Sequence, residues 1–222
     1  MSEFFSVKNI VFTAYGYGMS WLELIATIAG LLAVWLSAKE RIINWPIGLI
    51  NVGLSFFVFY QYNLYSDMLL QIYFFITGVY GWWQWTRKDT VSDEKVVKIS
   101  YLTRSQQWGM VGAIVIFTIV FGSMVGRFHE WFPMIFQQPA AFPYPDTLIM
   151  VMSLFGNLLL TVKKIESWIL WVLVDIIAPL IYFQKGMLLF TIMYVIFLGI
   201  AIFALLNWLK IYRQQQQTAS FP

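Results

Sequence analysis

The feature that most constrains this 222-residue chain is an internal repeat, in which similar residues recur 123 positions apart. The repeated stretches contain apolar runs of about 20 residues, the length that a helix needs to cross a bilayer. An internal repeat in a protein of several membrane spans is typical of a transporter built from two halves, with its substrate site between them. The matching pairs are Trp45 and Trp168, Gln61 and Gln184, Trp85 and Trp208, and the turns at Asn63 and Gly186.

The composition agrees with a polytopic membrane protein. Sixty per cent of the residues are hydrophobic and 11% are charged, which is more apolar surface than a soluble domain could bury. Aromatic residues make up 19%, more than interfacial belts require, so some of these rings are expected to line a site. Because there is no cysteine, disulfides and thiol chemistry are excluded, and we expect no metal and no cofactor. The net charge of +3 gives no reason to expect a nucleic-acid partner.

Seven apolar runs predict an all-α protein with seven transmembrane helices. The connections within each triple of runs are very short, so consecutive helices should be antiparallel neighbours. A single helix between two triples restores the direction of the chain, which predicts two parallel repeats in a 3+1+3 arrangement. The expected spans are 20–38, 43–62, 65–86, 107–125, 146–162, 166–184 and 187–208.

Five segments follow from this arrangement. The first repeat is expected at 20–86 and the second at 146–208. Between them, 87–145 holds a charged loop, the linker helix and a proline-rich external loop. Apolar residues within 1–19 suggest a helix lying in the outer membrane interface, and 209–222 is expected to be a disordered polar tail.

The distribution of lysine and arginine predicts the orientation. Three of these residues lie on the side that holds the N-terminus, and eleven lie on the other side. By the positive-inside rule, the N-terminus is outside and the C-terminus is in the cytoplasm of a cell with this protein in its inner membrane. The three are Lys8, Arg127 and Lys185; the eleven are Lys39, Arg41, Arg87, Lys88, Lys95, Lys98, Arg104, Lys163, Lys164, Lys210 and Arg213.

Three blocks of residues stand out in the first half of the chain. They are Asn44-Trp45-Pro46 with Gly48 and Asn51; Leu64-Tyr65-Ser66-Asp67 with Leu70-Gln71 and Tyr73; and Tyr80-Gly81-Trp82 with Trp85. The blocks resemble the signature of the PnuC vitamin transporter family, and the resemblance covers nearly the full chain. It implies import of nicotinamide riboside by facilitated diffusion, with the cargo trapped by cytoplasmic phosphorylation. Related members of the family carry thiamine or riboflavin, and the architecture is similar to that of the SWEET sugar carriers.

Polar and aromatic residues within the spans are the candidate substrate-binding residues, because such groups cost free energy in a membrane helix unless they are paired or functional. Tryptophan rings could stack on a heteroaromatic base, while amides and a carboxylate could bind a carboxamide and ribose hydroxyls. The candidates are Asn51, Gln71, Trp82, Asn157, Trp168, Trp171, Asp175 and Tyr194.

Several candidates have a structural alternative. Asn51 could join two helices, and Asp175 could pair with Asn157 or a tryptophan N–H. Trp168 could be an interfacial anchor, and Trp82 belongs to a cluster typical of an aromatic belt. The carboxylates of Glu23 and Asp67 lie near helix ends, where they are more typical of helix N-terminal charges.

No motif favours an enzyme, since the chain lacks the serine hydrolase, zinc protease and phosphate-loop patterns. The absence of a phosphate-binding loop also argues against transport driven by nucleotide hydrolysis in this chain. Proton coupling through Asp175 stays open as an alternative to uniport. Gly112, Gly122 and Gly126 on the linker helix could support contacts between protomers in a homo-oligomer such as a trimer.

Overall fold

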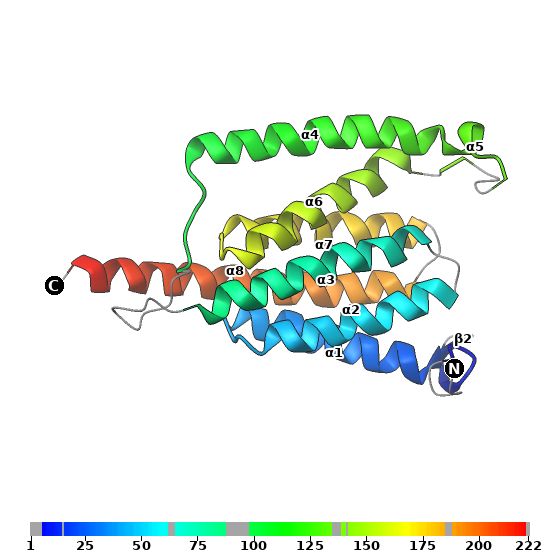
Figure 1. Cartoon of the computed structure of the whole chain (residues 1–222), viewed down its shortest axis with the longest axis horizontal. Coiled ribbons are helices and arrows are strands. Elements are labelled where there is room, and N and C mark those ends of the chain that lie inside the picture. Colours follow the sequence, from blue (N-terminus) through cyan, green and yellow to red (C-terminus); the bar gives the residue numbers. More distant parts are fainter. Residues whose placement is uncertain are drawn as a thin grey trace. The chain divides into compact units, whose positions relative to one another are not determined.

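The computed structural model describes residues 6–14, 16–61, 65–87, 98–134, 139–140, 142–184 and 188–220. These residues are mostly helical and belong to two compact units, Met1–Lys98 and Ile99–Pro222 (Figure 1). Four of the described helices are long and apolar enough to cross a membrane. They support the predicted class, an all-α polytopic membrane protein. The four stretches are Trp21–Ala38, Arg104–Gly126, Pro143–Thr161 and Thr191–Gln217.

The first unit is a short hairpin followed by three helices. Helix α2 packs against both α1 and α3. The turns expected at Asn63 and, in the second unit, at Gly186 lie outside the described residues. The elements are β1 (Ile10–Ala14), β2 (Tyr17–Ser20), α1 (Trp21–Ala38), α2 (Asn44–Gln61) and α3 (Tyr65–Thr86).

The N-terminal helix that the apolar residues of 1–19 suggested is wrong over 10–20, where β1 and β2 pair antiparallel. The β-branched and aromatic residues of Ile10–Ala14 favour an extended backbone. Gly16 has a φ of 82°, which lets the chain reverse where an L side chain would be strained. Glu23 then caps α1, because its carboxylate accepts from the backbone N–H and the hydroxyl of Ser20. The alternative held for Glu23, a helix N-terminal charge, is therefore the observed one.

The second unit contains five helices. Helix α6 packs against α4 and α7, and α7 packs against α8. Thr103 and Gln106 form a capping box that starts α4 three residues before the predicted span. Helices form over all seven predicted ranges, but the four-residue α5 is an additional element. The elements are α4 (Arg104–Gly126), α5 (Phe128–Trp131), α6 (Pro143–Thr161), α7 (Glu166–Gln184) and α8 (Leu188–Ser220).

The disordered tail predicted for 209–222 is wrong over most of its length, since α8 continues to Ser220. Lysine, arginine and glutamine are good helix formers, so the polar composition does not stop the helix. The extension is also held by packing, because the ring of Tyr212 meets that of Tyr101 edge to face at 5.1 Å between centroids.

The repeat is visible in the backbone of two turns. Glu40, between α1 and α2, has a φ of 55°, and Lys163, between α6 and α7, has a φ of 52°. The next N–H in each turn, that of Arg41 or Lys164, donates to a carbonyl five residues back, at 2.9 Å in both. Such a left-handed residue is uncommon outside glycine, so its presence at positions 123 apart indicates a common local structure.

The repeat is also visible in the core of each unit. Trp45 and Trp85 meet edge to face at 5.4 Å, and Trp168 and Trp208 do so at 5.8 Å. All four rings are buried. Each pair joins the start of one helix, α2 or α7, to the helix that follows it, α3 or α8. Edge-to-face geometry is favourable for aromatic rings.

Candidate functional site

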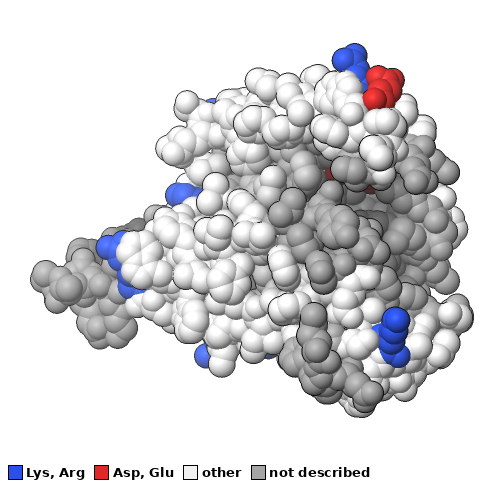
Figure 2. Space-filling model, turned by 45° about the vertical axis from the view of Figure 1, so that its right-hand side comes forward, with Lys and Arg blue, Asp and Glu red and all other residues white. Residues whose placement is uncertain are grey.

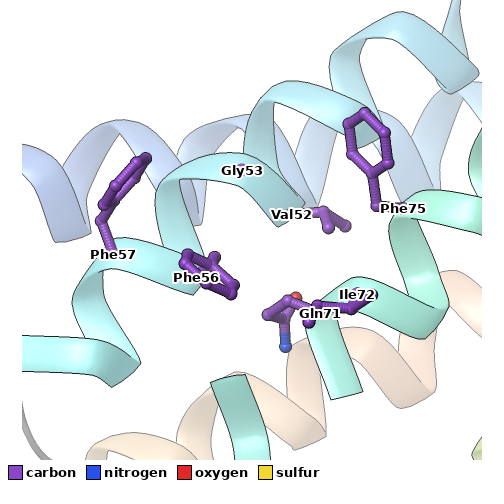
Figure 3. Close-up of a pocket in the computed structure, with 7 residues that line it drawn as sticks. All are labelled: Val52, Gly53, Phe56, Phe57, Gln71, Ile72 and Phe75. Atoms are coloured by element: carbon purple, nitrogen blue, oxygen red, sulfur yellow. The ribbon is translucent and has the colours of Figure 1, made fainter. Parts of the chain in front are cut away.

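A pocket in the first unit lies between α2 and α3 and has a cavity volume of about 230 Å³. Gln71, a predicted site residue, lines it and is only 8% exposed. Figure 3 shows the Gln71 side chain beside the ring of Phe56. The surface that lines this pocket is apolar, with aromatic and aliphatic walls that suit a flat ring. Its lining residues are Val52, Gly53, Phe56, Phe57, Gln71, Ile72 and Phe75.

The repeat relates this pocket to polar residues of the second unit. At a spacing of 123, Val52 corresponds to Asp175, Phe56 to Pro179 and Gln71 to Tyr194. Asp175 and Tyr194 are two of the predicted site residues. The candidates of the second unit therefore occupy the positions that form a pocket in the first. Separate sequence patterns suggest the candidates of the first and the second unit, and the repeat spacing relates these candidates to one another.

Asp175 is held inside the second unit. Its side chain is 3% exposed, and within the described ranges no hydrogen bond to its carboxylate is observed. It follows Val174 and precedes Ala178, both members of the hydrophobic core that α6 and α7 share. The pair with Asn157 or an indole N–H, the structural alternative for Asp175, is not observed there. A buried carboxylate without donors requires a cation, a proton or a ligand to offset its desolvation.

Trp171 lies one turn before Asp175 and packs on α6. A Cβ on Gly156 would lie 3.3 Å from the indole nitrogen of Trp171, so a glycine is needed for this close approach. Tyr194 of α8 packs against the same core as Trp171, with its ring edge to face with Phe197 at 6.2 Å. Asn157 of α6 is partly buried. The second unit thus holds five of the predicted residues on α6, α7 and α8, with Trp168 as the fifth.

Asn51 has the structural role that we held as its alternative. Its amide nitrogen donates to the carbonyl oxygen of Ala26 at 2.7 Å, joining α2 to α1. A Cβ on Gly30 would lie 2.9 Å from the same nitrogen, so the amide fits because residue 30 is glycine. Asn51 is not among the residues that line the pocket with Gln71.

Two tryptophan candidates lie apart from the pocket residues. Trp168 is 2% exposed and packs on Trp208, so it lies in a structural core rather than as an exposed interfacial anchor. Trp82 is exposed near the end of α3. It shares a helix face with Gln71 but lies eleven residues further along, about 16 Å at 1.5 Å per residue.

One residue weighed in the sequence, Asp67, has a side chain that lies outside what the structure describes. The pocket residues Val52, Phe56 and Phe75 were missed by the sequence reasoning. At the repeat spacing, Asp175 corresponds to Val52 and Tyr194 to Gln71. The spacing therefore identifies Val52 and indicates that α2 and α3 form the pocket. Among the described residues, no group of three or more His, Asp or Glu could hold a metal ion.

Charged residues are scarce on the described surface. Most of the described surface on the face shown in Figure 2 is uncharged, with a few lysine and arginine side chains and an acidic side chain at the upper right. Outside the spans, burial raises the pKa of the Tyr101 hydroxyl, and the charge of Glu166 raises it further. Tyr101 therefore stays neutral at physiological pH.

Comparisons with family models, curated proteins and solved structures all indicate the same family. The model of a family described as nicotinamide mononucleotide transporter matches residues 20–210. The nicotinamide riboside transporter PnuC of Escherichia coli (strain K12) is 34% identical over 236 residues, covering 98% of each chain. The riboflavin/roseoflavin transporter RibM of Streptomyces davaonensis is 22% identical and covers 91% of each. A crystal structure of the vitamin B3 transporter PnuC matches with a TM-score of 0.65 at 28% identity, over 87% of this chain and 83% of that one.

Proposed function

Because the chain belongs to the PnuC family of nicotinamide mononucleotide transporters, we propose that it carries nicotinamide riboside across the membrane. The observation that carries this proposal is the 34% identity to a nicotinamide riboside transporter over 98% of both chains. Membership of the family, together with the apolar helices, makes this a multi-pass membrane protein of the predicted all-α class. The same membership supports a transporter rather than an enzyme.

The chemistry of the two candidate regions suits this cargo. Nicotinamide riboside has a flat pyridinium ring, a carboxamide and ribose hydroxyls. Aromatic side chains such as Phe56 and Trp171 can attract the cationic ring by about 0.5–2 kcal/mol. Gln71 and Tyr194 can hydrogen-bond the polar groups, and Asp175 can offset the positive charge. Asn157 is a further candidate for these bonds.

The proposed architecture is two parallel three-helix repeats joined by α4. The repeated left-handed turns and tryptophan pairs support it. In this arrangement, rocking of one repeat against the other exposes the site to each side in turn. The predicted segments 20–86, 87–145 and 146–208 are the parts of this arrangement.

The proposed mechanism is facilitated diffusion, with net uptake maintained by phosphorylation of the cargo inside the cell. Reconstituted protein should then equilibrate nicotinamide riboside and accumulate it only when a trapping kinase is enclosed. Asp175→Asn should weaken binding by about 1–3 kcal/mol, since a charge-assisted contact is lost. Accumulation without the kinase, driven by a proton gradient and abolished in Asp175→Asn, would instead establish the proton-coupled alternative.

The cargo is tested by calorimetry on purified protein against a panel of vitamins. Nicotinamide riboside should bind and quench tryptophan fluorescence, because its pyridinium stacks on aromatic rings. Riboflavin is the main alternative, since RibM is a relative over 91% of the chain, and thiamine is the second. Heat for riboflavin or thiamine and none for nicotinamide riboside would reassign the cargo.

The proposed location is the inner membrane, with the N-terminus outside. The native chain has no cysteine, so single cysteines can report sidedness cleanly. With an impermeant thiol reagent outside intact cells, Gln138→Cys should label and Ser92→Cys should be protected. The reverse pattern would invert the topology. A homo-oligomer such as a trimer is also proposed, supported by the exposed apolar residues along α4; the mass of the detergent-solubilised protein tests it.

A further inference from the structure

Helix α7 contains a proline, Pro179, within its length. Proline has no N–H, so it cannot donate to the carbonyl oxygen four residues earlier. That carbonyl belongs to Asp175. The backbone oxygen of Asp175 therefore lacks its helical donor, and an unmade hydrogen bond inside a membrane helix is costly unless another group satisfies it.

The side chain of the same residue is a second acceptor. Asp175 is buried as a residue, and its carboxylate receives no hydrogen bond from the part of the chain that the structure describes. Residues four apart share a helix face, so Trp171, Asp175 and Pro179 lie along one stripe of α7. One turn of this helix thus combines a freed carbonyl, a buried carboxylate and, one turn earlier, an indole ring.

The first unit does not have this combination. The positions that correspond to Asp175 and Pro179 are Val52 and Phe56, both of which line the pocket beside Gln71. Phe56 has an N–H and interrupts no helical hydrogen bond, and Val52 has no charge. Of these corresponding pairs, Asp175 and Pro179 in the second unit are therefore rich in acceptors. Val52 and Phe56 in the first unit are apolar.

We propose that Asp175, with its carbonyl freed by Pro179, forms an acceptor-only site that selects a positively charged cargo ring over a neutral one of the same shape. Asp175 would contact the cargo, and Pro179 would be a positioning residue that acts through the Asp175 backbone. The inference rests on the proposed function. It adds a selectivity that neither the family nor the relatives' names state.

Reduced nicotinamide riboside is the discriminating probe. Its dihydropyridine ring keeps the carboxamide and ribose but has no charge, so only an electrostatic preference separates the two forms. Calorimetry on the purified wild-type chain should give at least about tenfold tighter binding of the oxidised, cationic form, a difference of about 1.4 kcal/mol. The measured quantity is the ratio of the two dissociation constants.

Two variants test the two acceptors. Asp175→Asn should lower the ratio toward the smaller preference that cation–π attraction to the aromatic rings alone provides. Pro179→Ala, which restores an N–H to the Asp175 carbonyl, should lower the ratio about threefold or more. Alanine is the better helix former, so Pro179→Ala is expected to fold. Pro143→Ala is the matched control, because Pro143 begins α6, where no helical N–H is lost; it should leave the ratio unchanged.

The outcomes separate the two levels of the proposal. If wild-type protein binds neither form, the proposed cargo is wrong. If it binds the oxidised form but the ratio stays the same in Asp175→Asn, the acceptor site is wrong while the cargo stands. A Pro179→Ala protein that folds and keeps the wild-type ratio overturns the role of Pro179. Should Pro179→Ala fail to fold, Pro179→Ser supplies the same N–H and decides the point by the same ratio.

Discussion

The turn between α1 and α2 and the turn between α6 and α7 share a backbone but differ in their surroundings. Both contain a left-handed residue, Glu40 or Lys163, and both lead into a buried tryptophan. In the first turn, Ile43 is 56% exposed. Its counterpart Glu166 is buried, because another segment of the second unit covers it.

That segment is 99–107, which precedes and begins α4. The backbone of Ser100 pairs with the turn, donating to the Lys163 carbonyl and accepting from the N–H of Ile165. One carboxylate oxygen of Glu166 accepts from the backbone N–H of Leu102 at 3.0 Å and from the Gln107 amide at 2.7 Å. These bonds hold the start of the linker helix to the second repeat.

The comparison shows how one repeated turn can serve two purposes. Its backbone is set by local contacts, so it survives in both copies. The outward side chain is free to change, and glutamate in place of isoleucine converts an open turn into a docking point. The linker helix accordingly forms part of the second unit rather than the first.

A second difference concerns the contact between the first two helices of each repeat. In the first, the Ala26 carbonyl accepts from Asn51 on the neighbouring helix. In the second, the corresponding carbonyl, that of Ile149, accepts from the Ser153 hydroxyl on its own helix at 2.8 Å. Ser153 corresponds to Gly30, and Asn51 corresponds to Val174, which has no hydrogen-bond donor. This carbonyl is therefore bound from the neighbouring helix in the first repeat and from its own helix in the second.

The largest expected effect tests what the two halves share. Trp45→Ala and Trp168→Ala should each lower the free energy of unfolding by about 3–5 kcal/mol, because each deletes a buried ring. Thermal unfolding in detergent, followed by circular dichroism, measures it. Trp108→Ala is the control, since that ring is exposed on α4 and should cost little. Trp168→Ala that stays stable yet loses cargo binding would return Trp168 to the substrate site.

The next effect tests where the halves differ. Glu166→Ala should destabilise by about 2–3 kcal/mol, since two donors of the linker segment are left without an acceptor. Ile43→Ala, at the corresponding exposed position, should change stability by less than about 0.5 kcal/mol. Glu166→Gln keeps one acceptor oxygen and should fall between them. Equal melting temperatures for Glu166→Ala and Ile43→Ala would show that the docking of 99–107 contributes nothing.

A smaller change in the free energy of unfolding is expected for the small residues that pack against the tryptophan pairs. Gly81 contacts the ring of Trp45 so closely that an added Cβ would overlap it. Gly81→Ala should therefore cost about 1–3 kcal/mol through overpacking. The corresponding residue of the second half is Ala204, which is fully buried, and Ala204→Gly should cost about 0.5–1 kcal/mol through backbone entropy. If Gly81→Ala were neutral in the unfolding assay, the two cores would be equivalent at this position.

The smallest expected effect separates the helix contacts. Asn51→Ala should cost about 1 kcal/mol by removing a hydrogen bond between α1 and α2. Ser153→Ala should cost close to nothing, because a serine bonding back to its own helix is not stabilising. Calorimetry with nicotinamide riboside should show unchanged affinity in Asn51→Ala. A large loss of affinity at full stability would make Asn51 a substrate residue after all.

Several elements could be predicted from the sequence because they depend on local or periodic signals. Apolar runs locate the helices, since a membrane helix must satisfy its backbone within itself. The repeat spacing locates both tryptophan pairs. The same spacing also relates Gln71 to Tyr194. In contrast, the apolar composition of 1–19 suggests a helix, whereas the β-branched and aromatic residues of Ile10–Ala14 and the reversal at Gly16 produce the hairpin of β1 and β2.

By itself, the sequence determined the membrane class, the repeat, the family resemblance and the set of polar residues within the spans. Only the tertiary structure decided what each of these residues contacts. Asn51 turns toward Ala26 because Gly30 leaves room, and Glu166 meets Leu102 across 64 positions. These contacts depend on whether a neighbouring helix has a glycine at the contact position and on which distant segment of the chain covers a turn. The periodicity of the residues predicts the helix face on which a side chain lies. It does not predict which other residue packs against that face.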